Sequence, residues 1–291
     1  MRYKHLVTTI ALLMTLGLAA CGATTQAQPA APADDQPVQI PEVAIEITDD
    51  GITAPAQMPA GIVAVKYTNA STQYQEGGVV LVKLNEGVTY EDIKALVAGD
   101  SPDSYAEFYR MVSSLGGGDR SIYNLTPGQY LAYFNGNVEA APPISSPITV
   151  KDEGNTAAAP TADVTAEMKD GSFVLPAEIK AGNHLWQISN TGQQIHHILI
   201  TKLPEGVTVD DIIAWVNEEV PSGPPPFLNP DGSVTGSGYE ALSPGQSAWT
   251  EIDLPVGQYT VFDLLPDMSA QPPVSHITEG MHQTLTVVAG D

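Results

Sequence analysis

The residues best suited to chemistry lie near the end of the chain, between Gly257 and Val288. A Pro-rich loop in this stretch carries His276, Met281 and His282, whose imidazole nitrogens and thioether sulfur are potential metal donors. Two alternating runs, QYTVF and HQTLTVV, enclose the loop and have the period of half-buried strands. A sheet is therefore expected to hold both ends of the loop, and His282, directly after Met281, is expected to face away from any site.

A second source of donors is the pair His196 and His197, which stands at the head of another expected strand, directly before the apolar residues ILI. Neighbouring residues of a strand point to opposite faces of the sheet. We therefore expect only one of these two imidazoles to face a site that is shared with the C-terminal loop.

The strands that must position these donors belong to a pattern that occurs twice. Runs such as VAIEIT, GIVAVKYTN and VVLVKL have the period-two or continuous apolar character of half-buried and buried strands. VVLVKLNEGVTYEDIKALV is answered later by HILITKLPEGVTVDDIIAWV, and DGITAPAQMPAGIVAVKYTN by DGSFVLPAEIKAGNHLWQISN. This repeat indicates a tandem duplication. We predict two all-β sandwiches, at 42–150 and 163–291, joined by a small-residue linker at 151–162.

One short helix is expected in each copy, before its last strands. Thr89 and Asp92 form the capping-box pattern that opens a helix through Ala98, and Thr208 and Asp211 open its counterpart. The residues that follow the first helix, up to position 118, are interpreted as a polar, Gly-rich excursion.

These features resemble the cupredoxins, the plastocyanin and azurin family. In related bacterial sequences of this type an Asn-Thr-Gly turn precedes a ligand histidine and a strand. A Tyr-containing strand, Pro-Asp, and then His, three residues and Gly-Met follow near the C-terminus. The matching residues here are Asn190-Thr191-Gly192, His196, Tyr259, Pro266-Asp267, His276 and Gly280-Met281. The resemblance implies two tandem Greek-key cupredoxin-like β-sandwiches, each with one short inserted helix.

The resemblance also implies a ligand set in the second copy. The family places a cysteine thiolate where Asp263 stands, and its other ligands match His196, His276 and Met281. Two imidazoles, a carboxylate and a weak thioether suit Cu(II) or Zn(II) and disfavour Cu(I). The alternative that the sandwich has lost its metal, and that the histidines are hydrogen-bonded polar residues, stays open.

The first copy lacks these donors. Gly77 stands at the position that matches His196, residues 134–147 contain neither histidine nor methionine, and no histidine occurs between positions 42 and 150. This copy is expected to be a scaffold or a binding surface.

The start of the chain resembles an export signal. Arg2 and Lys4 precede an apolar run over residues 6–18 that is too short for a stable membrane span, and LAAC resembles a bacterial lipobox that ends at Cys21. Residues 1–21 are therefore predicted to be a lipoprotein signal and 22–41 a disordered tether. Because Cys21 is the one cysteine of the chain, an internal disulfide and a blue-copper thiolate are both excluded.

The net charge is strongly negative. The chain carries 11 basic and 34 acidic residues, and removal of Arg2 and Lys4 with the signal would leave nine basic residues, since 11 minus two is nine. Nucleic acid and anionic lipid headgroups are poor partners for such a surface. The acidity is expected to serve solubility at an outer surface.

The sequence contains no GxSxG, HExxH, CxxC or phosphate-binding glycine motif, so no enzyme class is indicated. The leading interpretation is an exported, membrane-anchored, non-enzymatic binding module that binds Cu(II) or Zn(II) in its second copy. One alternative is an envelope electron-transfer copper protein. Another is a metal-free structural or protein-interaction lipoprotein. The oligomeric state and any envelope protein partner are left undetermined by these patterns.

Overall fold

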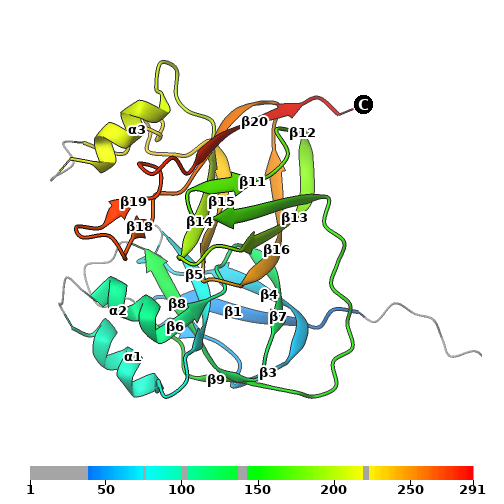
Figure 1. Cartoon of the computed structure of the whole chain (residues 1–291). Coiled ribbons are helices and arrows are strands. Elements are labelled where there is room, and N and C mark those ends of the chain that lie inside the picture. Colours follow the sequence, from blue (N-terminus) through cyan, green and yellow to red (C-terminus); the bar gives the residue numbers. More distant parts are fainter. Residues whose placement is uncertain (1–38, 75–76, 100–103, 137–142, 219–222, 291) are drawn as a thin grey trace, which may run out of the picture. The chain divides into compact units, whose positions relative to one another are not determined.

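The computed structural model describes residues 39–74, 77–99, 104–136, 143–218 and 223–290 (Figure 1). The described residues belong to one compact unit, Val38–Asp291. The predicted signal with Cys21, and the predicted tether as far as residue 38, lie outside the described residues. Among the residues that are described, no helix has the length and apolar character needed to cross a membrane.

The first copy consists of short strands and two helices. Its elements in chain order are β1 (Glu42–Thr48), β2 (Gly51–Thr53), β3 (Gln57–Pro59), β4 (Gly61–Asn69), β5 (Gly77–Leu84), α1 (Tyr90–Val97), α2 (Ser104–Met111), β6 (Val112–Ser114), β7 (Arg120–Leu125), β8 (Gly128–Gly136) and β9 (Ile148–Lys151).

The second copy repeats this order from Val164 onward. Its elements are β10 (Val164–Lys169), β11 (Ser172–Val174), β12 (Glu178–Lys180), β13 (Gly182–Asn190), β14 (His196–Thr201), α3 (Val209–Val216), β15 (Gly236–Leu242), β16 (Ser247–Leu254), β17 (Gly257–Phe262), β18 (Pro266–Asp267), β19 (Val274–Ser275) and β20 (His282–Val288). The short hairpin β18-β19 lies inside the donor-bearing loop.

The two copies have the same strand order. One sheet of the first copy runs β3-β9-β8-β5-β6, and its counterpart in the second copy runs β12-β20-β17-β14-β15. The opposing layers, β2-β1-β4-β7 and β11-β10-β13-β16, join into one eight-stranded sheet. The predicted all-β class with two tandem sandwiches is confirmed, although the first copy has two helices and not the expected one.

The copies are joined through strands rather than through a flexible connection alone. β16 pairs antiparallel with β7, with Trp249 opposite Ile122, and the hydroxyl of Ser114 donates to the carbonyl oxygen of Ala241 at 2.7 Å. The segment at 151–162 is also attached, because the Asn155 amide donates to the carbonyl oxygens of Ala60 and Ile62. The proposed domain boundaries stay a prediction.

The helices agree with the capping-box prediction and add one element. Thr89 and Thr208 are the N-caps of α1 and α3, and each accepts from the backbone of the predicted acidic residue three positions on. The first copy contains a second helix, α2, within the stretch that we interpreted as an irregular excursion. Phe108 of α2 is buried, and its ring lies 4.7 Å from the ring of Tyr133.

Candidate metal centre

Three neighbouring strands bring the candidate donors to one end of the second sandwich. His196 begins β14, Asp263 directly follows β17, and His276 and Met281 precede β20. β17 pairs antiparallel with both β14 and β20, so the start of these two strands lies beside the end of β17. Backbone topology alone therefore places residues far apart in the sequence at the same edge of the sheet.

The Asn-Thr-Gly turn holds the approach to His196. The buried Asn190 amide donates to the carbonyl oxygens of Gln194 and Leu242, at 2.7 Å each, and its own oxygen accepts from the backbone N–H of Gly192. A Cβ at Gly192 would meet the carboxylate of Asp170, which leaves glycine as the residue that fits there. The turn motif thus has a structural explanation in this chain.

Backbone hydrogen bonds fix the closing loop. The N–H of His276 donates to the carbonyl oxygen of Leu265 at 2.9 Å, and the N–H of Met281 donates to that of His276 at 2.9 Å. The N–H of Asp263 donates in turn to the carbonyl oxygen of Met281 at 3.2 Å. Backbone hydrogen bonds alone therefore fix the positions of Asp263, His276 and Met281 relative to one another.

The side chains of His196, Asp263 and His276 form a buried cluster in which one potential ligand atom of each lies within 4.8 Å of the others. The Oδ2 atom of Asp263 lies 2.8 Å from Nδ1 of His196 and 3.0 Å from Nδ1 of His276. The exposed fractions are 0%, 0% and 1%. A carboxylate has no proton to donate when ionised, so both imidazole Nδ1 atoms donate to it.

The far nitrogens of both imidazoles are also engaged. His196 Nε2 lies 3.0 Å from Oδ1 of Asp170, and His276 Nε2 lies 2.6 Å from Oε1 of Gln194. The N–H groups of Gln193 and Gln194 donate to Asp170 and hold it in place. Metal-ligating histidines commonly have their second ring nitrogen fixed by such a carboxylate or carbonyl oxygen. The outer partners therefore orient Nδ1 of each ring toward Asp263.

The protonation of the cluster follows from these contacts. Burial opposes ionisation of Asp263, but the hydrogen bonds from His196 and His276 outweigh it and lower its pKa to about 2. Burial likewise opposes the charged form of His196, and the contacts with Asp263 and Asp170 outweigh it and raise its pKa. The cluster is a charged, hydrogen-bonded network in the absence of an ion.

His197 departs from the expected alternation. Its Nε2 accepts from the N–H of Leu264 at 2.9 Å and lies 3.3 Å from Oδ1 of Asp263, although His196 already contacts the other oxygen of this carboxylate. The pairing of β14 with β15 shifts register between His196 and Ile198, and such a bulge re-aims side chains. His197 therefore contacts Asp263 as well, while the cluster of His196, Asp263 and His276 contains only the predicted histidine of the pair.

The remaining predicted donors lie in different surroundings. Met281 is fully buried and belongs to the main apolar core. His282 is exposed, as expected from its place after Met281. The residues that sequence reasoning missed are Asp170, which was noted only as the first residue of the repeated segment DGSFVLPAEIKAGNHLWQISN, and Gln194, whose spacing carries no chemical signal.

In the first copy, an aromatic side chain occupies the place that corresponds to the donor cluster. Phe134, the counterpart of Asp263 after the shared Gly-Gln-Tyr, is fully buried, and a Cβ at Gly77 would lie 2.9 Å from the end of its ring. The ring of Tyr74 packs against it at 5.4 Å. An aromatic ring and a glycine thus replace the carboxylate and the imidazole of the second copy.

Comparisons with known proteins give similarity in fold. No protein-family model and no curated protein matches the sequence. Dithionite-reduced auracyanin from Roseiflexus castenholzii is 23% identical over 43% of this chain and 94% of its own, with a TM-score of 0.30. Auracyanin A from Chloroflexus aurantiacus, a "blue" copper protein, is 19% identical over 43% and 98%, with a TM-score of 0.29. The copper-containing nitrite reductase of Thermus scotoductus is 12% identical over 86% and 62%, with a TM-score of 0.24. These values are low, so we base the site on the residues of this chain alone.

The donor set of this chain fits a divalent ion. Tetrahedral sites place nitrogen and oxygen ligands about 2.0 to 2.2 Å from the ion, and so about 3.3 Å from one another. The Nδ1 to Oδ2 distances of 2.8 and 3.0 Å would need to lengthen by only a few tenths of an ångström. The ion would take the place of the two Nδ1 protons, since ligand nitrogens must be deprotonated.

Proposed function

We propose that this chain is an exported, lipid-anchored, non-enzymatic binding protein whose second sandwich holds Cu(II) or Zn(II). His196, Asp263 and His276 would bind the ion, with Met281 as a weak fourth donor. The observation that supports this most directly is the burial of three donors within 4.8 Å of one another. Two imidazoles and one carboxylate are a ligand set that proteins use for zinc.

The absence of a thiolate favours storage or sensing of an ion over electron transfer. A His, His, Cys core is what gives a blue-copper site its fast redox chemistry. Asp263 supplies a harder oxygen donor, which suits Cu(II) and Zn(II) better than Cu(I). The electron-transfer alternative is therefore the less favoured one, and no side chain in the cluster suggests a catalytic step.

Metal binding is tested by calorimetric titration of the chain with zinc and with copper in a Cys21→Ser background, which removes the competing thiol. We expect saturable binding of one ion, and a loss of affinity of about 100-fold or more in His276→Ala, because even an outer partner of a ligand is worth about 10- to 100-fold. His282→Ala is the matched control, since this exposed histidine is a neighbour of the cluster in sequence. If the wild type and His276→Ala gave identical titration curves, the proposed metal site would be wrong and the metal-free alternative would remain.

The lipid anchor is proposed from the sequence around Cys21. In a bacterial host we expect the wild-type chain to sediment with membranes and to require detergent for release. Cys21→Ser should move most of the protein to the soluble extracytoplasmic fraction. An unchanged distribution of the variant would remove the anchor from the proposal.

A further inference from the structure

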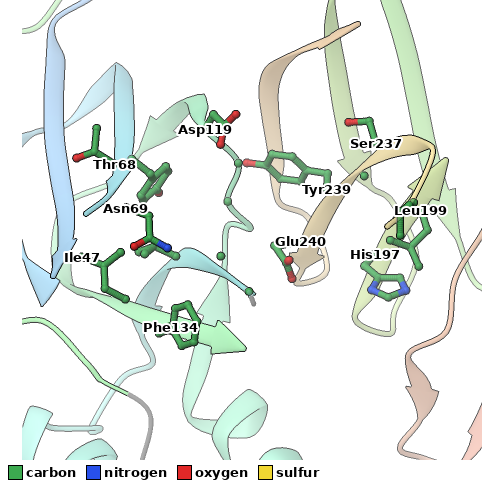
Figure 2. A pocket seen from close by; sticks show the side chains of 18 of the residues that line it. Ile47, Thr68, Asn69, Asp119, Phe134, His197, Leu199, Ser237, Tyr239 and Glu240 are labelled. Carbon is green, nitrogen blue, oxygen red and sulfur yellow. The ribbon is translucent and has the colours of Figure 1, made fainter. Parts of the chain in front are cut away.

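The compact unit Val38–Asp291 also contains a cavity whose lining does not include His196, Asp263 or His276. Its volume is about 410 Å³, and its walls come from β4, β5 and β8 of the first copy and from β14 and β15 of the second. Figure 2 shows Asn69 and Phe134 on one side, with Tyr239, Glu240 and His197 on the other. A concave space with a few convergent polar groups is the usual form of a small-molecule site.

The charged groups of this cavity have one sign. Glu240 and Asp119 contribute carboxylates to the cavity. The described residues that line it include neither lysine nor arginine. A cleft lined by one sign of charge concentrates the field inside it and attracts ions of the other sign. The cavity therefore favours a cationic ligand over an anionic or a neutral one.

Glu240 has no counter-charge of its own. Its side chain is half-buried, and Oε2 accepts from the Asn135 amide at 2.7 Å. The ion pairs found among the described residues do not include it. A carboxylate that is partly removed from water without a cation is unfavourable, and a bound cation would offset this cost.

Aromatic rings provide the second element of recognition. Phe134, Tyr67 and Tyr239 line the cavity. The hydroxyls of both tyrosines are engaged with Tyr123, at 2.9 Å for Tyr67 and 3.4 Å for Tyr239, so their contribution to a ligand is ring surface. Cations bind favourably over the faces of such rings.

We propose that this cavity binds a small organic cation that carries an ammonium or quaternary ammonium group. Glu240 supplies the counter-charge, Asp119 adds to the negative potential, and the half-buried ring of Tyr67 contacts the apolar substituents. None of His196, Asp263 and His276 lines the cavity, although His197, whose Nε2 lies 3.3 Å from Oδ1 of Asp263, lies on its wall. Metal binding could therefore fail without affecting this proposal.

The test uses the full-length chain in the presence of a chelator. Choline and putrescine serve as cationic probes, and 3,3-dimethyl-1-butanol serves as the uncharged molecule with the shape of choline. We expect saturable heat with at least one of the two cations and none with the alcohol. Failure of both cations, or equal binding of the alcohol, would overturn the proposal.

The variant that isolates the counter-charge is Glu240→Gln, which keeps the size of the side chain and its ability to meet Asn135. We expect it to weaken cation binding by about 10-fold or more, because a charged partner is worth about 1.5 to 3 kcal/mol. Glu205→Gln, at an exposed acid outside the cavity, is the matched control and should bind as the wild type does. Undiminished binding by a Glu240→Gln chain with a wild-type circular dichroism spectrum would contradict the assignment.

Discussion

Replacement of Asp263 by alanine is expected to lower the free energy of unfolding by about 3 to 5 kcal/mol, the range found when one partner of a buried charge pair is removed. The variant would leave Nδ1 of His196, Nδ1 of His276 and the N–H of Leu265 without their acceptor. The two imidazoles lose their hydrogen bonds at a buried place, and the N–H of Leu265 loses one that is partly buried. Urea unfolding followed by tryptophan fluorescence measures the difference.

The matched control is Asp253→Ala, which removes an exposed carboxylate from β16 in the same copy. Surface substitutions of this kind change stability by about 0.5 kcal/mol or less. If Asp263→Ala also changed stability by less than about 1 kcal/mol, the hydrogen-bonded cluster would not exist in solution as described.

The loss caused by Asp263→Ala should also depend on pH. The pKa of Asp263 is lowered from 3.8 to about 2, so its contribution is complete above 3.8 and disappears as the pH falls toward 2. The pKa of His196 is raised above 6.5, so its contribution is complete below 6.5 and is lost as the pH rises through the raised value. The difference between wild type and variant is therefore greatest from about pH 4 to about pH 6.5, and a difference independent of pH would contradict this account.

Sequence patterns predicted the fold well because the signals were local and repeated. Capping boxes at Thr89 and Thr208 define helix starts within a few residues, and both are present. Helix α2 was missed although its eight residues are amphipathic, because the Gly- and Ser-rich residues on either side were interpreted as an irregular excursion. Its Phe108 packs on Tyr133 from a different part of the chain. That contact depends on tertiary structure, which local patterns do not encode.

The candidate site was predictable in part for a similar reason. His196, Asp263 and His276 could be named because they occupy motif positions in a recognisable pattern of strands. Asp170 and Gln194 could not, since their roles arise from where two turns meet in space. The reach of His197 toward Asp263 depends on a shift of register in β14, and a bulge of this kind has no signature in these residues.

The internal comparison of the two copies shows what the second one has kept. Phe134 fills the place of the carboxylate in the first copy, and Gly77 makes room for its ring. The second copy instead has two buried imidazoles that are oriented by hydrogen bonds at both ring nitrogens. The second copy has the donor side chains, and the first copy has an aromatic ring and a glycine in their place. This difference is expected if only the second copy binds an ion.

Asp263→Cys is expected to convert the cluster into a coloured copper site. The substitution places a thiolate beside Nδ1 of His196 and of His276, with the buried Met281 nearby in the closing loop. A His, His, Cys set with a weak methionine is the ligand set of blue-copper centres. Addition of Cu(II) should produce an intense visible absorption from thiolate-to-copper charge transfer, and the wild-type chain should show none.

The comparison requires a Cys21→Ser background in both chains, so that any thiolate absorption comes from position 263. The double variant Asp263→Cys, His276→Ala is the matched control and should lose most of the band, because one imidazole of the set is missing. A band of the same intensity with and without His276 would mean that the new thiolate binds copper elsewhere. A colourless Asp263→Cys chain that retains the wild-type fold would mean that His196 and His276 do not converge on position 263. Colour that depends on both imidazoles would show that Asp263 occupies the position of a metal ligand, and that the wild-type carboxylate determines which ion this sandwich can hold.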